Sequence, residues 1–466
     1  MMLSEQRLLP SDPTVRGIAE SLYAGIAALP IVSPHGHCNP RWFADDVQFT
    51  DPTELLIKPD HYLLRLFYSQ GIELARLGRG VNANEDNRAI WQLFAEHYPS
   101  FEGTPSKIWL DHAMQKVLLI EEPLTAENAD RIYNDICRRL RENDYSARKL
   151  FERFGIEVLA TTEGALDGLQ YHDRIAQSDW KGRVITTYRP DQVTDPDTPD
   201  FSEKLARFGA MTGEDTANWK GYLNAHRKRR EEFRRRGATA TDHSHPNANT
   251  ADLGKPACQH LLDRILVGTA TTEDKEAFRA QVLTEMAGMS REDGMVMQLH
   301  CGVRRNHNSA LFSEFGPDIG GDMPRRAEFV NALAPLLNRH GNDPNLRLVL
   351  FTLDESTYSR ELAPLAGHWP CLRIGPPWWF HDSPEGMRRY FASVIETAGF
   401  ANLAGFNDDT RAFFSIPARH DMWRRELASF LARLVTEGRL SEAAAHGIAA
   451  DLAYHAAKRV YGLTTP

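Results

Sequence analysis

Two histidines separated by a single glycine, His35 and His37, are the side chains of this sequence best suited to holding a metal ion. On an extended chain, residues i and i+2 project to the same side, so both imidazoles can converge on one ion. The alternative is a surface loop with two incidental histidines. Because a catalytic zinc site typically takes three protein ligands and leaves one position open, we expect further ligands from elsewhere in the chain.

Two candidates for these ligands stand at the ends of apolar runs much later in the chain. His300 ends one such run, and Asp409 ends another. A buried polar group without a partner costs on the order of 2–7 kcal/mol, so a ligand or a hydrogen bond must satisfy each side chain. We therefore expect His300 and Asp409 to face the same site as His35 and His37.

A second histidine pair, His243 and His245, follows Asp242 and competes with the first pair. Asp242 and His243 are expected to support the site through hydrogen bonds or to touch the substrate. We favour His35 and His37 as the metal-binding pair. The roles of Asp242, His243 and His245 stay open at this point.

Arginines at strand ends indicate an anionic substrate. Arg189 ends an apolar run, and Arg411 lies two residues after Asp409. A planar guanidinium can hold a carboxylate through two parallel hydrogen bonds, although each arginine could instead pair with a neighbouring acid. Trp378 begins a tryptophan pair and offers a flat apolar wall on which a sugar can stack; its alternative role is to fill the core.

The elements that must position these residues alternate between strand and helix. Apolar, β-rich runs close on polar clusters, which is typical of parallel barrel strands whose carboxyl ends carry a site. Helical periodicity lies between most of them, for instance over residues 326–339 and 386–398. This alternation predicts an α/β fold, a (β/α)8 TIM-type barrel. The expected strands are 29–37, 156–163, 183–189, 238–245, 294–300, 346–354, 371–379 and 404–411.

The uneven spacing of these strands predicts how the chain is divided. The gap after the first strand far exceeds the usual connection of about 2–6 residues, so it must hold structure of its own. Alanine-rich segments after the last strand are helical by propensity and are expected to pack outside the barrel. The predicted parts are an N-terminal segment with strand one (1–44), a helical insertion over the barrel mouth (45–154), strands two to eight (155–421) and C-terminal helices packed on the barrel (422–466).

The charge balance argues against polyanionic partners. With 54 Lys and Arg against 63 Asp and Glu, the net charge is −9, and such a surface repels phosphate backbones and anionic lipid heads unless its basic residues cluster. They cluster once, at 227–236, in a run that also contains two glutamates and is typical of a solvated amphipathic helix. We expect no nucleic-acid partner.

The cysteines and the hydropathy pattern point to the cytoplasm. The five cysteines are scattered and form no Cys-x-x-Cys pair, which argues against a disulfide framework and against a thiolate zinc site. No stretch approaches the roughly 18 apolar residues that a membrane span needs, and the N-terminus lacks the apolar segment of a signal peptide. We expect a cytoplasmic homo-oligomer with no membrane partner, whose number of subunits the sequence leaves open.

Six motifs in order give the chain a resemblance to a known family. It resembles the uronate isomerases, a branch of the amidohydrolase superfamily, along essentially its whole length. That family interconverts D-glucuronate with D-fructuronate and D-galacturonate with D-tagaturonate. The motifs are His35-Gly36-His37, Asp60-His61-Tyr62, Thr187-Tyr188-Arg189-Pro190-Asp191, Gln298-Leu299-His300, Trp378-Trp379-Phe380, and Asp409-Thr410-Arg411 followed by Arg419-His420.

The resemblance implies a role for each candidate residue. His35, His37 and Asp409 would hold one divalent metal ion, with zinc preferred. Moving a proton from carbon 2 to carbon 1 through an enediol needs a base, an acid and a positive centre for the developing oxyanion. Asp409 or Tyr62 would transfer the proton, and His300 would orient or protonate an oxygen. The expected substrate contacts, with a small sugar acid, are Tyr62, Arg189, His300, Trp378 and Arg411.

The main alternative is a metal-dependent hydrolase on the same fold, in which the ion would activate water. Many two-metal hydrolases of the superfamily carry a carbamylated lysine at the end of strand four, where this chain has Asp242-His243-Ser244-His245. Two departures from the uronate isomerase pattern concern fine substrate contacts. They are Thr161-Thr162-Glu163-Gly164-Ala165, where many relatives carry paired aspartates, and the continuation Cys301-Gly302-Val303-Arg304-Arg305.

Overall fold

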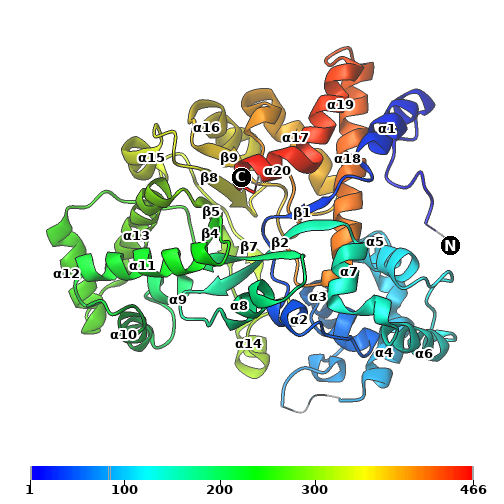
Figure 1. The fold of residues 1–466 in the computed structure, drawn as a ribbon, viewed down its shortest axis with the longest axis horizontal. Helices are drawn as coiled ribbons and strands as arrows, with labels where there is room; N and C mark the ends of the chain where they lie inside the picture. The colour runs from blue at the N-terminus through cyan, green and yellow to red at the C-terminus, as the bar shows by residue number, and fades with distance from the viewer. Residues whose placement is uncertain (1–2, 82, 84, 464–466) are drawn as a thin grey trace.

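The computed structural model describes residues 3–81, 83 and 85–463. At its centre, the described chain forms a sheet of seven parallel strands in the order β1-β2-β3-β4-β5-β8-β9, curled so that helices cover its outside (Figure 1). Consecutive strands are neighbours, as in a (β/α)8 barrel, and the predicted fold class is confirmed. The strands are β1 Ile31–Ser33, β2 Ile156–Gly164, β3 Arg183–Arg189, β4 Ala240–His245, β5 Val296–Cys301, β8 Leu348–Thr352 and β9 Leu372–Ile374.

The predicted eighth strand, 404–411, is wrong as a strand, although the segment occupies the eighth position. Its start bonds to β9, where the Ala404 N–H donates to the Ile374 carbonyl at 2.9 Å. Its end meets the segment after β1, where the His37 N–H donates to the Thr410 carbonyl at 3.0 Å. Left-handed backbone at Gly405 (φ 81°) and Asp409 (φ 38°) interrupts the extended geometry that a strand requires. The segment therefore closes the barrel as an irregular loop.

The helices between the strands pack on the outer face of the sheet. The predicted helix 386–398 is confirmed within α17, whereas 326–339 is helical only from Ala334. Before that point the Glu328 carboxylate accepts the backbone N–H groups of Asn331 and Ala332, which replaces helical bonding. The main outer helices are α8 Gln170–Gln177, α10 Phe201–Thr212, α11 Trp219–Arg235, α12 Lys255–Leu266, α13 Thr272–Asp293, α15 Ala334–His340, α16 Ala363–His368 and α17 Pro384–Ala398.

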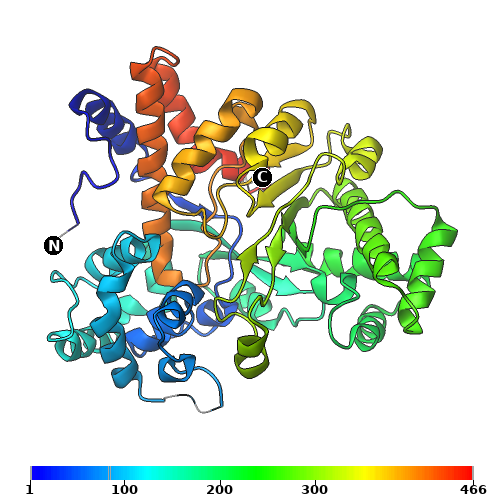
Figure 2. The ribbon, with the colours of Figure 1, turned by 180° about the vertical axis from the view of Figure 1, so that it is seen from behind.

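Residues between β1 and β2 form a group of short helices with its own apolar core. Trp91, Phe94 and Ile132 are among its fully buried side chains. Figures 1 and 2 show this group and the helices α10–α13 on opposite flanks of the sheet. Its principal helices are α3 His61–Ser69, α4 Asn87–His97, α5 Pro105–His112, α6 Ala129–Leu140 and α7 Ala147–Arg153. The exact boundaries of the four predicted parts stay a prediction.

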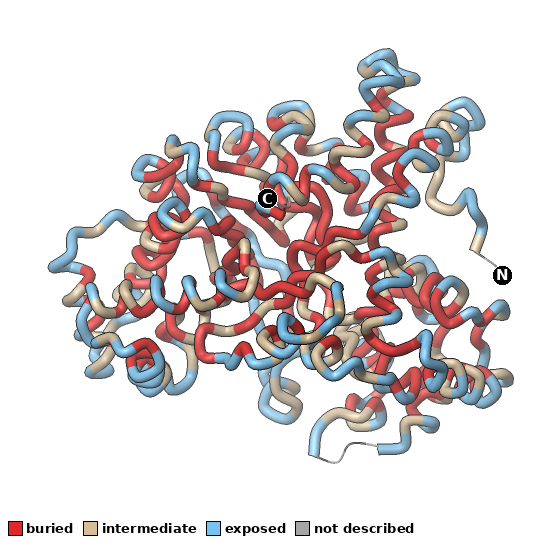
Figure 3. Tube along the Cα trace, viewed as in Figure 1, coloured by how far each residue is buried: buried red, intermediate tan, exposed pale blue. Residues whose placement is uncertain are grey.

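The C-terminal helices lie partly outside and partly inside the barrel. Helices α18 (Ile416–Thr436) and α19 (Glu442–Ala450) pack outside, against α1 (Pro13–Ile26). The prediction that all of the C-terminal part packs outside is wrong, because α20 (Ala456–Val460) and Tyr461 join the apolar cluster of the barrel interior. Small strand residues such as Ala160 and Ala240 leave space there, and the end of the chain fills it. In Figure 3 most of the tube around this centre is buried.

The basic run 227–236 lies on the end of α11 and on its C-cap, Arg236, and is largely neutralised by local acids. Arg227 pairs with Glu292, Arg230 with Asp293, and Arg236 with Asp173.

No helix in the described part of the chain is both long and apolar enough to cross a membrane.

Glu163 gives this barrel a titratable group outside the cavity. It is buried on the outer face of β2, where its carboxylate accepts hydrogen bonds from the hydroxyls of Thr161 and Thr186. Burial raises the pKa of Glu163 from 4.5 to about 7. Between these values the folded state keeps a proton that the unfolded chain has lost, so the stability falls as pH rises.

We expect Glu163→Gln to remove this pH dependence, which amounts to on the order of 3 kcal/mol. Measured by urea unfolding from pH 5 to pH 8, the variant should gain stability over the wild type towards pH 8. The matched control is Glu157→Gln on the same strand. The pKa of Glu157 is lowered: burial favours the neutral acid, but Lys458 and Tyr454 outweigh it, so no gain is expected. Equal pH slopes in wild type and Glu163→Gln would contradict the prediction.

Candidate active site

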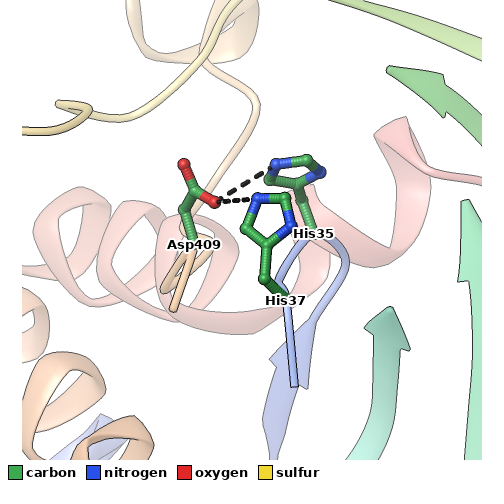
Figure 4. Close-up of side chains that lie close together, drawn as sticks. All are labelled: His35, His37 and Asp409. Atoms are coloured by element: carbon green, nitrogen blue, oxygen red, sulfur yellow. Dashed lines mark ion pairs between the residues drawn. The ribbon is translucent and has the colours of Figure 1, made fainter. Parts of the chain in front are cut away.

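His35, His37 and Asp409 meet at the carboxyl end of β1 (Figure 4). The Asp409 Oδ1 atom lies 3.3 Å from His35 Nε2 and 3.1 Å from His37 Nε2. Both histidines follow the last residue of β1, and the left-handed backbone of Asp409 turns its carboxylate towards them. A non-glycine residue in this conformation stores strain, which is common where function fixes a side chain.

These three side chains fit a divalent metal ion. One ligand atom from each lies within 4.8 Å of the other two. Asp409 Oδ1 is buried and has no regular hydrogen bond in the described structure, although two ring nitrogens stand beside it. Burial favours the neutral acid, but the rings of His35 and His37 hold the pKa of Asp409 well below its usual range. An anionic oxygen and two imidazole nitrogens form a donor set typical of transition-metal sites.

His300 and Asp242 form a buried pair next to this cluster. His300 Nδ1 lies 2.6 Å from Asp242 Oδ1, and both side chains are almost fully buried. Burial lowers the pKa of His300, while His300 and Arg189 hold the pKa of Asp242 low against the effect of burial. Because the carboxylate can only accept, Nδ1 carries the proton of the neutral ring. His300 Nε2 therefore keeps a free lone pair, and it has no partner among the described residues.

His35 links the two clusters, because it also belongs to a second group that could hold a cation, with Asp242 and His300. The rings of His35 and His300 stack at 4.8 Å between centroids. His35 Nδ1 lies 3.3 Å from Gln298 Nε2, and the Gln298 Oε1 atom accepts from the Tyr461 hydroxyl at 3.0 Å. The C-terminal end of the chain thus supports a candidate metal ligand from inside the barrel.

The second histidine pair does not act as a unit. His243 Nε2 lies 3.0 Å from Thr241 Oγ1, on the outer side of β4, whereas Asp242 and His245 reach the cavity. Successive side chains of a strand face opposite sides, so Asp242 and His243 cannot both point inward. Asp242 is the member of this segment with the clearest role, which is to fix the ring of His300.

The predicted site residues line one cavity of about 450 Å³. Trp378 forms part of its wall, with its ring edge-on to His300 at 4.7 Å between centroids. The cavity brings together all eight side chains that the sequence singled out, from both ends of the chain and from the helices after β1. These are His35, His37, Tyr62, Arg189, His300, Trp378, Asp409 and Arg411.

The two predicted substrate arginines occupy different positions. Arg189 lies deep, with Nε 2.7 Å from Asp191 Oδ2 and Nη1 3.6 Å from Asp242 Oδ2. The Arg411 side chain is 38% exposed and lies 3.4 Å from Asp318 Oδ2. One guanidinium is therefore held by acids inside the cavity, whereas the other makes a longer contact at its mouth.

The sequence did not reveal a further pair in this cavity, Asp382 and Arg419. Asp382 Oδ1 accepts the Tyr62 hydroxyl at 2.7 Å, and Asp382 Oδ2 accepts from Arg419 Nη1 at 2.7 Å. The sequence pointed to Arg419 only through the Arg419-His420 motif, which carried no assigned role. Asp382 follows an aromatic run and has no distinctive spacing of its own.

Comparison with known proteins identifies the family. A model of the glucuronate isomerase family matches residues 6–461. The chain belongs to the glucuronate isomerase family. A uronate isomerase of Xanthomonas axonopodis pv. citri is 56% identical over 467 residues, 99% of each chain. The structure of a glucuronate isomerase from Caulobacter crescentus superposes with a TM-score of 0.98 at 51% identity, covering 100% of this chain and 98% of that one. The structure of a uronate isomerase from Thermotoga maritima superposes with a TM-score of 0.92 at 26% identity, covering 99% of this chain and 100% of that one.

Family membership confirms that this chain is an enzyme, an isomerase, and the hydrolase alternative is not favoured.

The departure noted at residues 161–163 has a structural explanation. Thr161 and Glu163 face away from the cavity, while the Thr162 hydroxyl donates to the Gly36 carbonyl at 2.9 Å. This part of β2 supports the histidine loop, and Thr161, Thr162 and Glu163 do not line the cavity.

Proposed function

We propose that this enzyme interconverts hexuronate aldoses with their keto isomers, D-glucuronate with D-fructuronate and D-galacturonate with D-tagaturonate. The observation that carries the proposal is one cavity that holds an ionised Asp409, the acceptor nitrogen of His300 and two arginines. Aldose–ketose isomerisation moves one proton between adjacent carbons and needs such groups around one small anion. The names of the related proteins, uronate isomerase and glucuronate isomerase, support a uronate as the substrate.

One divalent ion, zinc by preference, belongs to this proposal, with His35, His37 and Asp409 as its ligands. When bound, the ion supplies positive charge that stabilises an oxyanion developing on the substrate. The donor set supports a divalent ion, and the choice of zinc rests on the preference of that metal for such ligands.

The residues of the chain divide the remaining tasks. Asp409 is ionised and acts as the base that moves the proton between carbon 2 and carbon 1. His300 accepts a hydrogen bond from a substrate hydroxyl, because its Nδ1 proton is committed to Asp242. Tyr62 is the alternative group for moving protons to and from the substrate oxygens. Burial holds the pKa of Tyr62 well above its usual value, so it acts as a neutral phenol.

Arg189 and Arg411 bind the substrate carboxylate and neighbouring hydroxyls in this proposal. Arg189 is held in place by Asp191 and Asp242, so it presents a preorganised cation. Arg411 makes only a longer contact with Asp318 and can exchange that partner for the substrate. Trp378 forms the apolar wall against which the sugar ring packs.

We place the enzyme in the cytoplasm as a homo-oligomer. All five cysteines are free, and four of them are buried, which suits a reducing compartment. Size-exclusion chromatography with light scattering tests the assembly.

The reaction is tested by incubating the metal-loaded protein with each hexuronate in deuterated water and following the sugar by proton NMR. We expect the keto acid to appear, with deuterium entering at the transferred position to the extent that the base exchanges with solvent. Glu163→Gln, altered outside the cavity, should convert substrate like the wild type. No conversion of either sugar, together with cleavage of an amide or ester, would favour the hydrolase alternative.

A further inference from the structure

Tyr62 is held by a pair of oppositely charged residues from other parts of the fold, the partly buried Asp382 and the buried Arg419. Tyr62 is the second residue of α3, Asp382 lies just before α17, and Arg419 lies in the first turn of α18. Asp382 is 320 residues from Tyr62 in the sequence, and Arg419 is 37 residues from Asp382. All three line the same cavity as Asp409 and His300.

The contacts of the Tyr62 hydroxyl fix the position of its single proton. The hydroxyl donates to Asp382 Oδ1 at 2.7 Å and accepts from the Phe380 N–H at 3.0 Å. A phenol has one proton to donate and accepts through its oxygen lone pairs. Because a carboxylate can only accept, the Tyr62 proton points at Asp382, and one lone pair of the phenol oxygen remains for the cavity.

Arg419 holds Asp382 in place. Its Nη1 atom donates to Asp382 Oδ2 at 2.7 Å, and its Nε atom donates to Ser415 Oγ at 3.2 Å. The guanidinium also stacks over Trp109, 3.6 Å from the ring centroid. These contacts hold the cation through its charge, its hydrogen bonds and its flat face, so it has little freedom to move.

We propose that Asp382, held by Arg419, is a positioning residue that sets Tyr62 as an acceptor of a substrate hydroxyl proton. The inference rests on the proposed isomerase function and adds residues to which the family resemblance assigned no role. When a substrate hydroxyl gives its proton to the Tyr62 oxygen, Tyr62 can pass its own proton to Asp382. The reverse movement restores both protons, so none is gained or lost over the reaction.

The test compares Asp382→Asn, Tyr62→Phe and the double variant by steady-state kinetics with D-glucuronate. If Asp382 acts through Tyr62, each single change lowers kcat by roughly 10–100-fold. The double variant should then be no worse than Tyr62→Phe, because both changes remove one unit. KM should change by less than about threefold, since the substrate carboxylate contacts are untouched.

Two further variants separate positioning from folding. Asp382→Glu keeps the charge and should recover part of the lost kcat, while metal content and circular dichroism stay at wild-type values. Glu385→Gln is the matched control, because Glu385 is an exposed acid on the same segment that pairs with Arg388. It should leave kcat unchanged.

The outcomes distinguish this inference from the proposed function. Losses that multiply in the double variant would show that Asp382 and Tyr62 act independently and would overturn the inference. An unchanged kcat in Asp382→Asn would overturn it as well. A wild-type enzyme that converts neither hexuronate would instead overturn the proposed function, and the inference with it.

Discussion

Replacing Asp409 by asparagine should release most of the bound metal and lower kcat/KM by at least roughly 10²–10⁴-fold, the usual contribution of a proton-transferring group. The change keeps the size of the side chain but removes the anionic oxygen between His35 Nε2 and His37 Nε2. In the proposed mechanism it removes a ligand and the base at once. Metal content after dialysis, measured by plasma mass spectrometry, reports the first effect, and steady-state kinetics report the second.

The control for this variant is Asp318→Asn, which removes a carboxylate from the rim of the same cavity. Asp318 contacts Arg411 and belongs to neither of the groups suited to a cation, so metal content should stay at the wild-type value. If Asp409→Asn keeps both its metal and its activity, the assignment of Asp409 is wrong. If it keeps its metal but loses activity, Asp409 is the base and not a required ligand.

Replacing Asp242 by asparagine should lower kcat on the order of 10²-fold without removing the metal. Asp242 accepts the Nδ1 proton of His300 at 2.6 Å, which leaves Nε2 as an acceptor towards the cavity. An asparagine can donate to Nδ1, which moves the ring proton to Nε2 and turns the acceptor into a donor. If the amide instead turns its oxygen to His300, its NH₂ group faces the Arg189 guanidinium, which is also unfavourable.

Nitrogen NMR of labelled histidine provides a readout of this change that does not depend on turnover. The wild type should show His300 with its proton on Nδ1, and Asp242→Asn should show the other tautomer. A suitable comparison is His243→Gln, because His243 lies on the outer side of the same strand and does not line the cavity. An Asp242→Asn variant with the original tautomer and full activity would refute the role given to Asp242.

Local patterns predicted the strands that are long and bounded by clear turns. The predicted strand 183–189 coincides with β3, and 156–163 differs from β2 by one residue. The segment 404–411 has the composition of a strand, but two left-handed residues and the proximity of α20 prevent one. Gly405 shows why, because a Cβ atom there would lie 2.7 Å from the Ala457 nitrogen. The conflict arises from a tertiary contact that local periodicity does not encode.

The sequence by itself determined which side chains can do chemistry and at which ends of its apolar runs they stand. His35, His37, His300 and Asp409 were recognised because polar groups that close buried apolar runs need partners, and all of them line one cavity. Tertiary structure alone decided how the supporting residues pair. Asp242 meets His300 across 58 residues of sequence, Tyr62 meets Asp382 across 320, and Tyr461 meets Gln298 across 163. Hydrophobic periodicity specifies which face of an element is buried, whereas the choice of a polar partner depends on which elements the folded chain brings together.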